Sequence, residues 1–460
     1  MHPTRTDSTP ATPADVFASL AAATPAARAA AVLGMLDGLG LERRLALGAT
    51  DGLGAVLDDV ALPGARMPSA DLSGAKARRA DLRRADLAGA DLRGADFGGA
   101  RLAKAHLATA NLGGAELGAT DLAGADLSKA NLAKALCEEA NFGGAKLRFA
   151  DLRDAACEQA KFARADLWGA DLTGAECGRA DFRRAVLTES TACGADFRGA
   201  DLRAAVMTRA DFRGADLSRA DLRGAHVVGA DFRGANLQHA RLDGLDLTAV
   251  ALEGVRLAGA RLDGARLEWQ QFGERLGEEI GGDIEAARGG YLALERVFIA
   301  LGDTAAASWA YLRRRRMEKR LAWQFARLRW TQRRPWASAK AAGAAAGDQG
   351  IEWLCDYGES IGRVIVSLAA VFVGFAVLYV LTESVVRVGP GPNGVEVRQV
   401  TASPSDLAIF SLLALTTSGS PVVALQPRDQ FVHFLTGVQA LFGISLTGLL
   451  GFVVGNRIRR

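Results

Sequence analysis

Residues 80–94 have the sequence ADLRR-ADLAG-ADLRG, three successive copies of one five-residue unit. The same frame continues in both directions without an insertion or deletion. From Ala65 to Ala265 every fifth position can be compared, and 36 of these 41 positions are Ala. Leu or Phe usually follows two residues later, with Asp or Asn between. A five-residue period fits neither an α-helix nor a flat strand, whose side chains repeat every ~3.6 and ~2 residues.

This period predicts a solenoid, in which each unit forms one side of a coil and then turns a corner. The Leu or Phe and the Ala would point inward, because the crowded corner favours a small side chain. Similar residues also recur every 20 positions, as Cys137, Cys157 and Cys177 do, which predicts four units in one coil. We interpret these cysteines as small buried apolar residues. A redox or metal-binding thiol ladder is the alternative.

The A-(D/N)-L-x-x pattern resembles the pentapeptide-repeat family and covers nearly half of the chain. The resemblance implies a mainly β N-terminal half, a right-handed quadrilateral β-helix over residues 65–268. Some soluble members of that family are acidic rods that imitate DNA. Residues 65–267 contain 28 Asp and Glu against 30 Lys and Arg, and this mixed surface argues against DNA mimicry. The frame explains the recurring Asp residues, so we expect no enzyme activity, no cofactor and no metal site.

The segments on either side of the repeat differ in composition. Residues 1–14 are rich in Pro, Thr and Ser and are predicted to be a disordered tail. Residues 15–64 are predicted to be a helical N-terminal cap, and residues 269–350 a helical, basic linker. From 303 to 340 there are 11 basic residues against two acidic ones. We interpret part of this cluster as a juxtamembrane contact for anionic lipid headgroups, with a solvated helix face as the alternative and no nucleic acid expected. These candidate residues are Arg313, Arg314, Arg315, Arg316, Lys319 and Arg320.

Residues 351–460 contain two long apolar stretches. The first, 361–382, has Arg363 as its one charge, and the second, 431–454, has His433 as its one ionisable group. As helices they match the ~30 Å hydrocarbon core of a bilayer. Basic clusters precede the first stretch and follow the second. The positive-inside rule therefore predicts a two-span protein of the inner or plasma membrane, with both termini and the rod in the cytoplasm.

The connection between these stretches holds a shorter helix signal. Ser403 and Asp406 are placed to cap the start of a helix, and the apolar run 407–415 is too short to cross a bilayer. We expect a re-entrant pore helix, whose C-terminal dipole favours a cation. Hydroxyl and carbonyl oxygens beyond it would replace the water around the ion. This predicted ion filter consists of Thr416, Thr417, Ser418, Gly419 and Ser420.

Residues 360–460 contain, in order, an apolar span, the expected re-entrant helix, the motif Thr-Thr-x-Gly and a second apolar span. This order of segments resembles the two-transmembrane potassium-channel-like pore family. The resemblance implies a homotetramer, because each chain supplies a quarter of the ion path. Residues 291–320 and 357–359 also resemble the connector of bacterial channels that fuse pentapeptide repeats to such a pore. Potassium filters continue Gly-Tyr-Gly-Asp, whereas this chain continues Gly419-Ser420-Pro421. We therefore expect weak or altered K⁺ selectivity, with K⁺, Na⁺ or both permeating.

Gly443 in the second span is a candidate hinge of the inner helix, and close helix packing is the alternative interpretation. The sequence thus predicts a homotetrameric monovalent-cation channel that carries cytoplasmic repeat rods as regulatory or scaffold domains. The alternative function is a membrane-anchored scaffold with a degenerate, non-conducting pore, whose rod binds an unknown protein partner. A scaffold has no need of a capped re-entrant helix that ends in hydroxyl residues, and this favours the channel.

Overall fold

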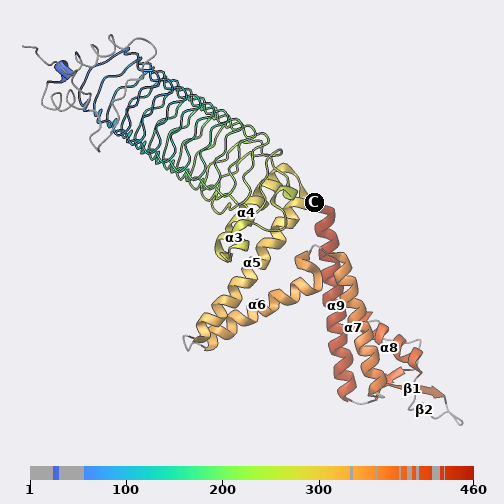
Figure 1. Ribbon diagram of the computed structural model, residues 1–460. Helices are drawn as coiled ribbons and strands as arrows, with labels where there is room; N and C mark the ends of the chain where they lie inside the picture. The colour runs from blue at the N-terminus through green and yellow to red at the C-terminus, as the bar shows by residue number, and fades with distance from the viewer. Residues whose placement is uncertain are drawn as a thin grey trace, which may run out of the picture. The chain divides into compact units, whose positions relative to one another are not determined.

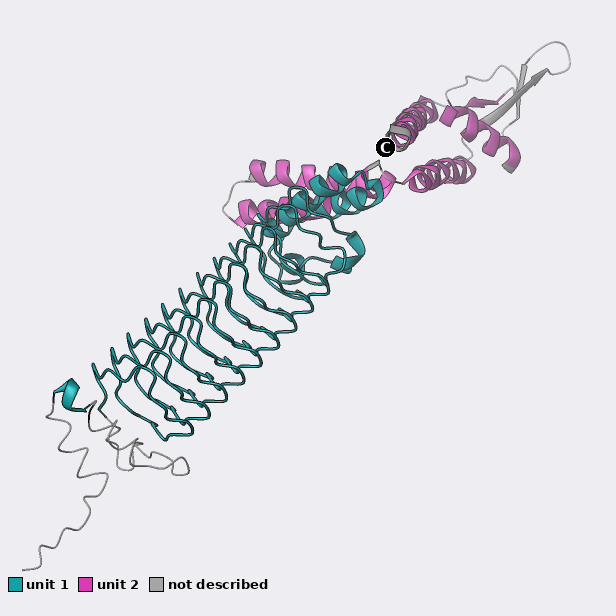
Figure 2. Cartoon of the chain, turned by 90° about the horizontal axis from the view of Figure 1, so that it is seen from above, with its two compact units in different colours: residues 1–314 teal, residues 315–460 magenta. Residues whose placement is uncertain are grey.

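The computed structural model describes residues 24–28, 30, 56–331, 335–358, 360–382, 385–390, 396–399, 403–416, 425–428 and 430–459. The chain divides into two compact units, residues 1–314 and residues 315–460, which Figure 2 shows in two colours. The boundary between them falls within helix α5 (Thr304–Thr331).

A β-helix of stacked coils makes up most of the first unit, drawn in blue to green in Figure 1. Parallel bridges join residues 20 apart along it, from Val56↔Lys76 to Asp246↔Arg266. This spacing confirms that four pentapeptides form one coil. Among the described residues the coils begin at residue 56, so residues 56–64 belong to the β-helix and not to the predicted helical cap. The motif is degenerate there, but Leu57, Val60 and Leu62 are buried at its inward positions.

Each pentapeptide bonds to the coils before and after it. The N–H of Leu82 donates to the carbonyl of Arg101 in the next coil (2.8 Å), and the N–H of Asp81 donates to Val60 in the preceding one (2.8 Å). A third bond, from Ala85 N–H to Leu82 O (3.0 Å), closes the turn. The fifth position adopts a positive φ, as Gly89 does at 63°, and this favours glycine there. The coils therefore satisfy their own backbone polar groups.

Apolar columns fill the interior of the β-helix. Phe162 stacks between Phe142 and Phe182, with ring centroids 4.8 and 4.7 Å apart and planes within 7° of parallel. Cys137, Cys157 and Cys177 are buried in a column of their own, in agreement with their interpretation as apolar core residues.

Side chains from the following segment satisfy polar backbone groups at the C-terminal end of the β-helix. The Gln271 amide donates to the carbonyls of Leu247 (2.6 Å), Thr248 (3.1 Å) and Val250 (2.7 Å). The buried Glu278 carboxylate accepts the N–H groups of Leu257 and Ala258, each at 2.6 Å. Burial raises the pKa of Glu278. A solenoid needs such a cap, because its last coil would otherwise expose an unpaired edge.

Short helices then cover this end of the β-helix. The elements are η1 (Trp269–Phe272), α3 (Gly277–Ile280) and α4 (Ile284–Leu301). Tyr291 of α4 is fully buried, and its hydroxyl donates to Glu279 at 2.7 Å. Trp309, in the first turns of α5, packs against the Tyr291 ring at 5.6 Å. Helix α4 ends at Gly302, which adopts the left-handed conformation, and Asp303 caps the start of α5.

In its described residues the second unit is helical, with one small sheet. Beyond the end of α5, its helices are α6 (Pro335–Cys355), η2 (Asp356–Gly358), α7 (Ile361–Leu381), α8 (Pro404–Thr416) and α9 (Gln430–Arg459). Strands β1 (Val385–Pro390), β2 (Glu396–Gln399) and β3 (Leu425–Pro427) pair antiparallel in the order β2-β1-β3. The register places Arg387 opposite both Gln399 and Leu425. This sheet lies in the connection between the long helices and was not predicted.

Two helices of this unit are long and apolar enough to span a membrane, Ile361–Leu381 and the segment Gln430–Gly455 of α9. They agree with the two predicted stretches to within a few residues. Large apolar side chains cover much of their outer surface. Val366 and Leu381 of α7 are 67% and 76% exposed, and Leu441 of α9 is 66% exposed. Exposed apolar side chains of this size are suited to contact with hydrocarbon.

Candidate functional site: the short helix between two long apolar helices

Helix α8 begins with reciprocal side-chain caps. The N–H of Asp406 donates to Ser403 Oγ at 3.2 Å, and the Asp406 carboxylate accepts the N–H of Ser403 at 3.1 Å. Two of the N–H groups that a helix start leaves unpaired are satisfied in this way. Asp406 is buried, with 8% of its surface exposed. The start of α8 is therefore fixed by its own side chains.

A buried polar network holds the middle of α8 against both long helices. The Gln439 amide of α9 donates to the Ser411 hydroxyl (2.7 Å) and to the Ser411 carbonyl (3.0 Å). The Tyr379 hydroxyl of α7 donates to the Gln439 amide oxygen at 2.9 Å. Ser411 in turn donates to the Phe372 carbonyl of α7 at 3.0 Å. Tyr379, Ser411 and Gln439 are completely buried, so one network joins three helices.

Gly443 lies where the end of α8 meets α9. A Cβ placed on Gly443 would overlap the carbonyl group of Leu415. Nothing lies within 4 Å of the corresponding position at Gly437, Gly448 or Gly451. The absence of a side chain at Gly443 therefore permits a close backbone approach. This contact supports the packing interpretation of Gly443, and its role as a hinge of the inner helix stays a prediction.

The predicted ion filter starts at the C-terminus of α8. Thr416 is the last residue of this helix, and its hydroxyl donates to the Leu412 carbonyl at 3.0 Å. Thr417, Ser418, Gly419 and Ser420 lie outside the described residues.

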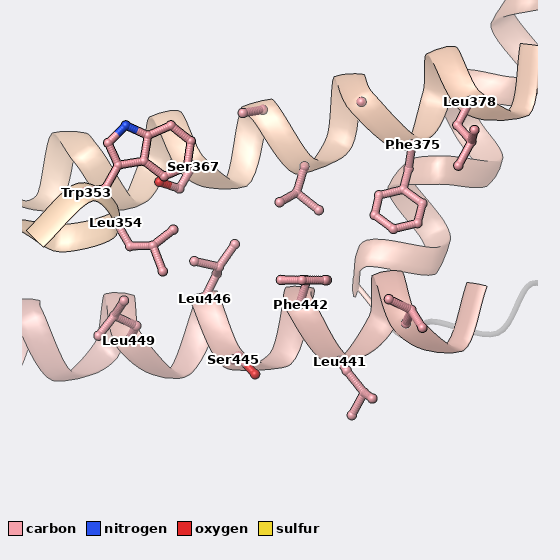
Figure 3. Close-up of a pocket in the computed structure, with 14 residues that line it drawn as sticks. Trp353, Leu354, Ser367, Phe375, Leu378, Leu441, Phe442, Ser445, Leu446 and Leu449 are labelled. Carbon is pink, nitrogen blue, oxygen red and sulfur yellow. The ribbon is translucent and has the colours of Figure 1, made fainter. Parts of the chain in front are cut away.

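An apolar groove of about 760 Å³ lies between α7 and α9. Figure 3 shows Phe375 of α7 and Leu446 of α9 pointing into the space between the helices. Ser367 and Ser445 supply the only side-chain oxygens among the residues that line it. The groove therefore offers few ligands for an ion and suits hydrocarbon.

The basic residues of α5 make ion pairs with distant carboxylates. In the first unit Arg314 lies 2.7 Å from Glu295, and Arg313 lies 3.7 Å from Glu279. In the second unit three cations pair with residues of α6. Arg315 pairs with Asp348 (2.5 Å), Arg316 pairs with Glu352 (3.1 Å), and Lys319 also pairs with Glu352.

These pairs change the interpretation of the basic cluster. Although burial opposes the shift, hydrogen bonds from Lys319 and Arg316 lower the pKa of Glu352. Five of the six cations proposed to contact lipid are thus partly neutralised by carboxylates of the same chain. Lipid binding by this cluster stays a prediction, with less free charge than the sequence suggests.

No group of three or more His, Cys, Asp or Glu side chains is arranged to hold a metal ion in the part of the chain that the structure describes.

The sequence did not single out Tyr379, Ser411 and Gln439, the residues that position α8. A polar residue within each apolar stretch was the available signal, because such residues are costly in a membrane unless they are paired.

The family described as Pentapeptide repeats matches the chain with eight copies. The matched residues are 65–102, 110–148, 140–176, 150–189, 180–219 and 215–254. The chain contains a pentapeptide-repeat domain. No match to a channel family accompanies it. A search of curated proteins found no match.

Several solved structures are similar to this domain, and two of those named below are pentapeptide-repeat proteins. HetL, a protein involved in heterocyst differentiation regulation in the cyanobacterium Nostoc, is 29% identical over 51% of this chain and 92% of its own, with a TM-score of 0.38. A pentapeptide-repeat protein of the Arabidopsis thaliana thylakoid lumen is 34% identical over 23% of this chain and 70% of its own, with a TM-score of 0.15. QnrB1, a plasmid-mediated fluoroquinolone resistance protein, is 20% identical over 48% of this chain and 95% of its own, with a TM-score of 0.22.

Proposed function

We propose that this protein is a homotetrameric membrane channel for monovalent cations, with weak or altered K⁺ selectivity. The second unit would form the pore, and the pentapeptide-repeat domain would be a cytoplasmic regulatory or scaffold domain. The observation that carries the proposal is the way α8 is held. A helix of 13 residues is capped at its start, bonded at Ser411 to both long helices and packed at Leu415 against Gly443.

The chemistry of this arrangement suits a cation. A 13-residue helix is about 20 Å long, which is too short to cross the ~30 Å hydrocarbon core. A short helix that ends inside the membrane directs the negative end of its dipole at whatever follows Thr416. In the sequence, three hydroxyl residues and a glycine follow within four positions, and their oxygens would coordinate a dehydrated cation.

The filter sequence limits what the pore would select. Pro421 stands where potassium filters have their second glycine, and its fixed φ and missing N–H change the backbone there. The aromatic residue that braces a potassium filter is replaced by Ser420. We therefore propose permeation by K⁺ and Na⁺ in comparable amounts. Basic segments before α7 and at the end of α9 support a cytoplasmic location for both termini.

Reconstitution of the full chain in planar bilayers tests the proposal. Under K⁺/Na⁺ and K⁺/Cl⁻ gradients we expect unitary currents whose reversal potentials show preference for cations over Cl⁻ and little discrimination between K⁺ and Na⁺. Gly419→Asp should abolish the currents, because a carboxylate would bind the cation at the filter. Gly394→Asp, a matched change in the connection before α8, should leave them intact.

Two outcomes would contradict the channel. Currents that persist in Gly419→Asp would show that ions take another route. Silence across voltage, pH and membrane tension, from protein that is folded and inserted, would favour the membrane-anchored scaffold. The protein partner of the pentapeptide-repeat domain would then be the next object of study.

A further inference from the structure

One face of the pentapeptide-repeat domain contains a hollow of about 750 Å³ surrounded by arginines. Four arginine residues line it, and small residues form the rest of the lining. The arginines are Arg164, Arg183, Arg184 and Arg203, and the small residues are Gly143, Gly144, Ala163 and Ala204. No carboxylate is among these lining residues.

The repeat places the arginines on consecutive coils. The N–H of Arg164 donates to the carbonyl of Arg183 at 2.9 Å, and the N–H of Arg184 donates to that of Arg203 at 3.0 Å. Arg164 and Arg184 are 20 residues apart, so their backbones stack at the ~4.8 Å spacing of adjacent strands. Small residues in the neighbouring turns leave the hollow beside them. In the column that contains Arg164 and Arg184, Gly144 lies one coil before Arg164, and Ala204 lies one coil after Arg184.

Two of the four guanidinium groups are already neutralised. Arg183 lies 2.6 Å from Asp181, and Arg203 lies 2.6 Å from Asp201. Arg164 and Arg184 have no ion pair within the described residues, and both side chains are exposed. The lining therefore holds two uncompensated positive charges one coil apart, which repel each other unless an anion lies between them.

We propose that this hollow binds a small molecule that carries two or more phosphate charges, such as a nucleotide or an inorganic polyphosphate. The planar guanidinium fork matches phosphate oxygens with two parallel hydrogen bonds. The volume lies in the usual range for small-molecule sites, about 300–1,000 Å³. A nucleic-acid strand would need a basic track along many coils, whereas Gly144 and Ala204 interrupt the column on both sides.

A second hollow on another face provides the comparison. It has a volume of about 650 Å³, and Arg179, Arg198 and Arg219 line it together with the carboxylate of Glu158. Arg179 and Arg219 make no ion pair within the described residues. Because Glu158 repels phosphate, we expect much weaker binding there. The proposal does not depend on channel activity.

Isothermal titration of the full chain in nanodiscs, with ATP, inorganic pyrophosphate and adenosine as probes, tests this site. We expect saturable binding of ATP and pyrophosphate, one per chain, that weakens with added salt, and no binding of adenosine. The double variant Arg164→Gln/Arg184→Gln should weaken both affinities at least about tenfold. The matched variant Arg179→Gln/Arg219→Gln, with the same loss of charge, should bind within about twofold of the native chain.

The probes also distinguish the source of the phosphate. Similar affinities for ATP and pyrophosphate would assign recognition to phosphate alone, and tighter binding of ATP would assign further contacts to the nucleoside. Equal weakening in both double variants, or no saturable binding, would overturn the proposal. Tighter binding of single-stranded RNA than of ATP would overturn it in favour of a polymer. Unchanged circular dichroism of the exposed-arginine variants would confirm that they fold.

Discussion

The β-helix and the helical unit accommodate polar groups in opposite ways. Inside the β-helix, the buried Thr120 and Ser190 take the place of alanine. The Thr120 hydroxyl donates to the Phe97 carbonyl in the preceding coil, and the Ser190 hydroxyl donates to the Leu187 carbonyl in its own coil, so both bonds stay within the repeated stack. In the helical unit, Gln439 bonds to residues 28 and 60 positions away. The β-helix repeats one local rule in every coil, whereas the position of α8 depends on a few unique contacts. Damage should therefore remain local in the first and disrupt the site in the second.

Truncation of a stacked ring in the β-helix should have the largest effect on stability. Phe162→Ala removes a fully buried ring between two others and should destabilise the folded domain by about 3–5 kcal/mol. Phe149→Ala is the control, because that side chain is 49% exposed and should cost less than about 1 kcal/mol. Urea denaturation followed by circular dichroism compares the two. Equal shifts would show that the stacked column does not stabilise the coils.

Disruption of the contact between Gly443 and the end of α8 should have the second-largest effect on stability. Gly443→Ala forces a methyl group into the Leu415 carbonyl and should cost about 1–3 kcal/mol through overpacking. The displacement of α8 should also reduce cation currents. Gly448→Ala places its methyl group in open space and should leave both the stability and the currents unchanged. Thermal stability in detergent and bilayer currents measure these effects, and a tolerated Gly443→Ala would argue against a fixed α8.

Removal of the buried amide should have a smaller effect. Gln439→Leu leaves the Tyr379 hydroxyl without its acceptor and removes two bonds to Ser411, which should cost about 1–2 kcal/mol in a membrane. Gln430→Leu, an exposed position at the start of α9, is the control. Hydrogen exchange of α8 amides is the measurement. We expect faster exchange in Gln439→Leu alone, and unaltered exchange would contradict the role of the network.

A fall in pH should have the smallest effect on the stability of the folded protein, and this effect should arise in both units. The Arg153 guanidinium lowers the pKa of Asp151 in the β-helix, as Lys319 and Arg316 lower that of Glu352. Because these pKa values are lower in the folded protein, the pairs stabilise it at neutral pH. This stabilisation is lost as the pH falls through the lowered values. Asp151→Asn and Glu352→Gln should each flatten the decline of melting temperature with acid, only slightly because solvent screens such pairs.

The β-helix was predictable because its signal is repeated. The same inward Leu or Phe and Ala recur along about 200 residues, so one wrong assignment changes little. Its start was placed too late, because Val60 and Ala61 replace the residues that define the motif. The end cap was missed as well. Nothing near Gln271 or Glu278 in the sequence indicates that they bond to backbone groups 20 or more residues earlier.

The helical unit was predictable in outline only. Length and polarity predicted α7, α8 and α9, but the partners of Arg315 and Arg316 lie 33 and 36 residues further along the chain. A single sequence does not show which carboxylate will face which cation. Ser411 and Gln439 looked like isolated polar residues in apolar runs. Their role depends on tertiary contacts between three helices.

The central claim is that ions pass the C-terminal end of α8. Chemical modification at Thr416 tests this claim most directly, because Thr416 is the last residue of α8, where the proposed ion path begins. A positively charged, water-soluble thiosulfonate reagent would be applied to Thr416→Cys channels in bilayers, with Ser405→Cys at the other end of α8 as the control. The account predicts rapid, irreversible loss of current in Thr416→Cys alone. Currents that persist after confirmed modification of Cys at position 416 would contradict the placement of the ion path at the end of α8.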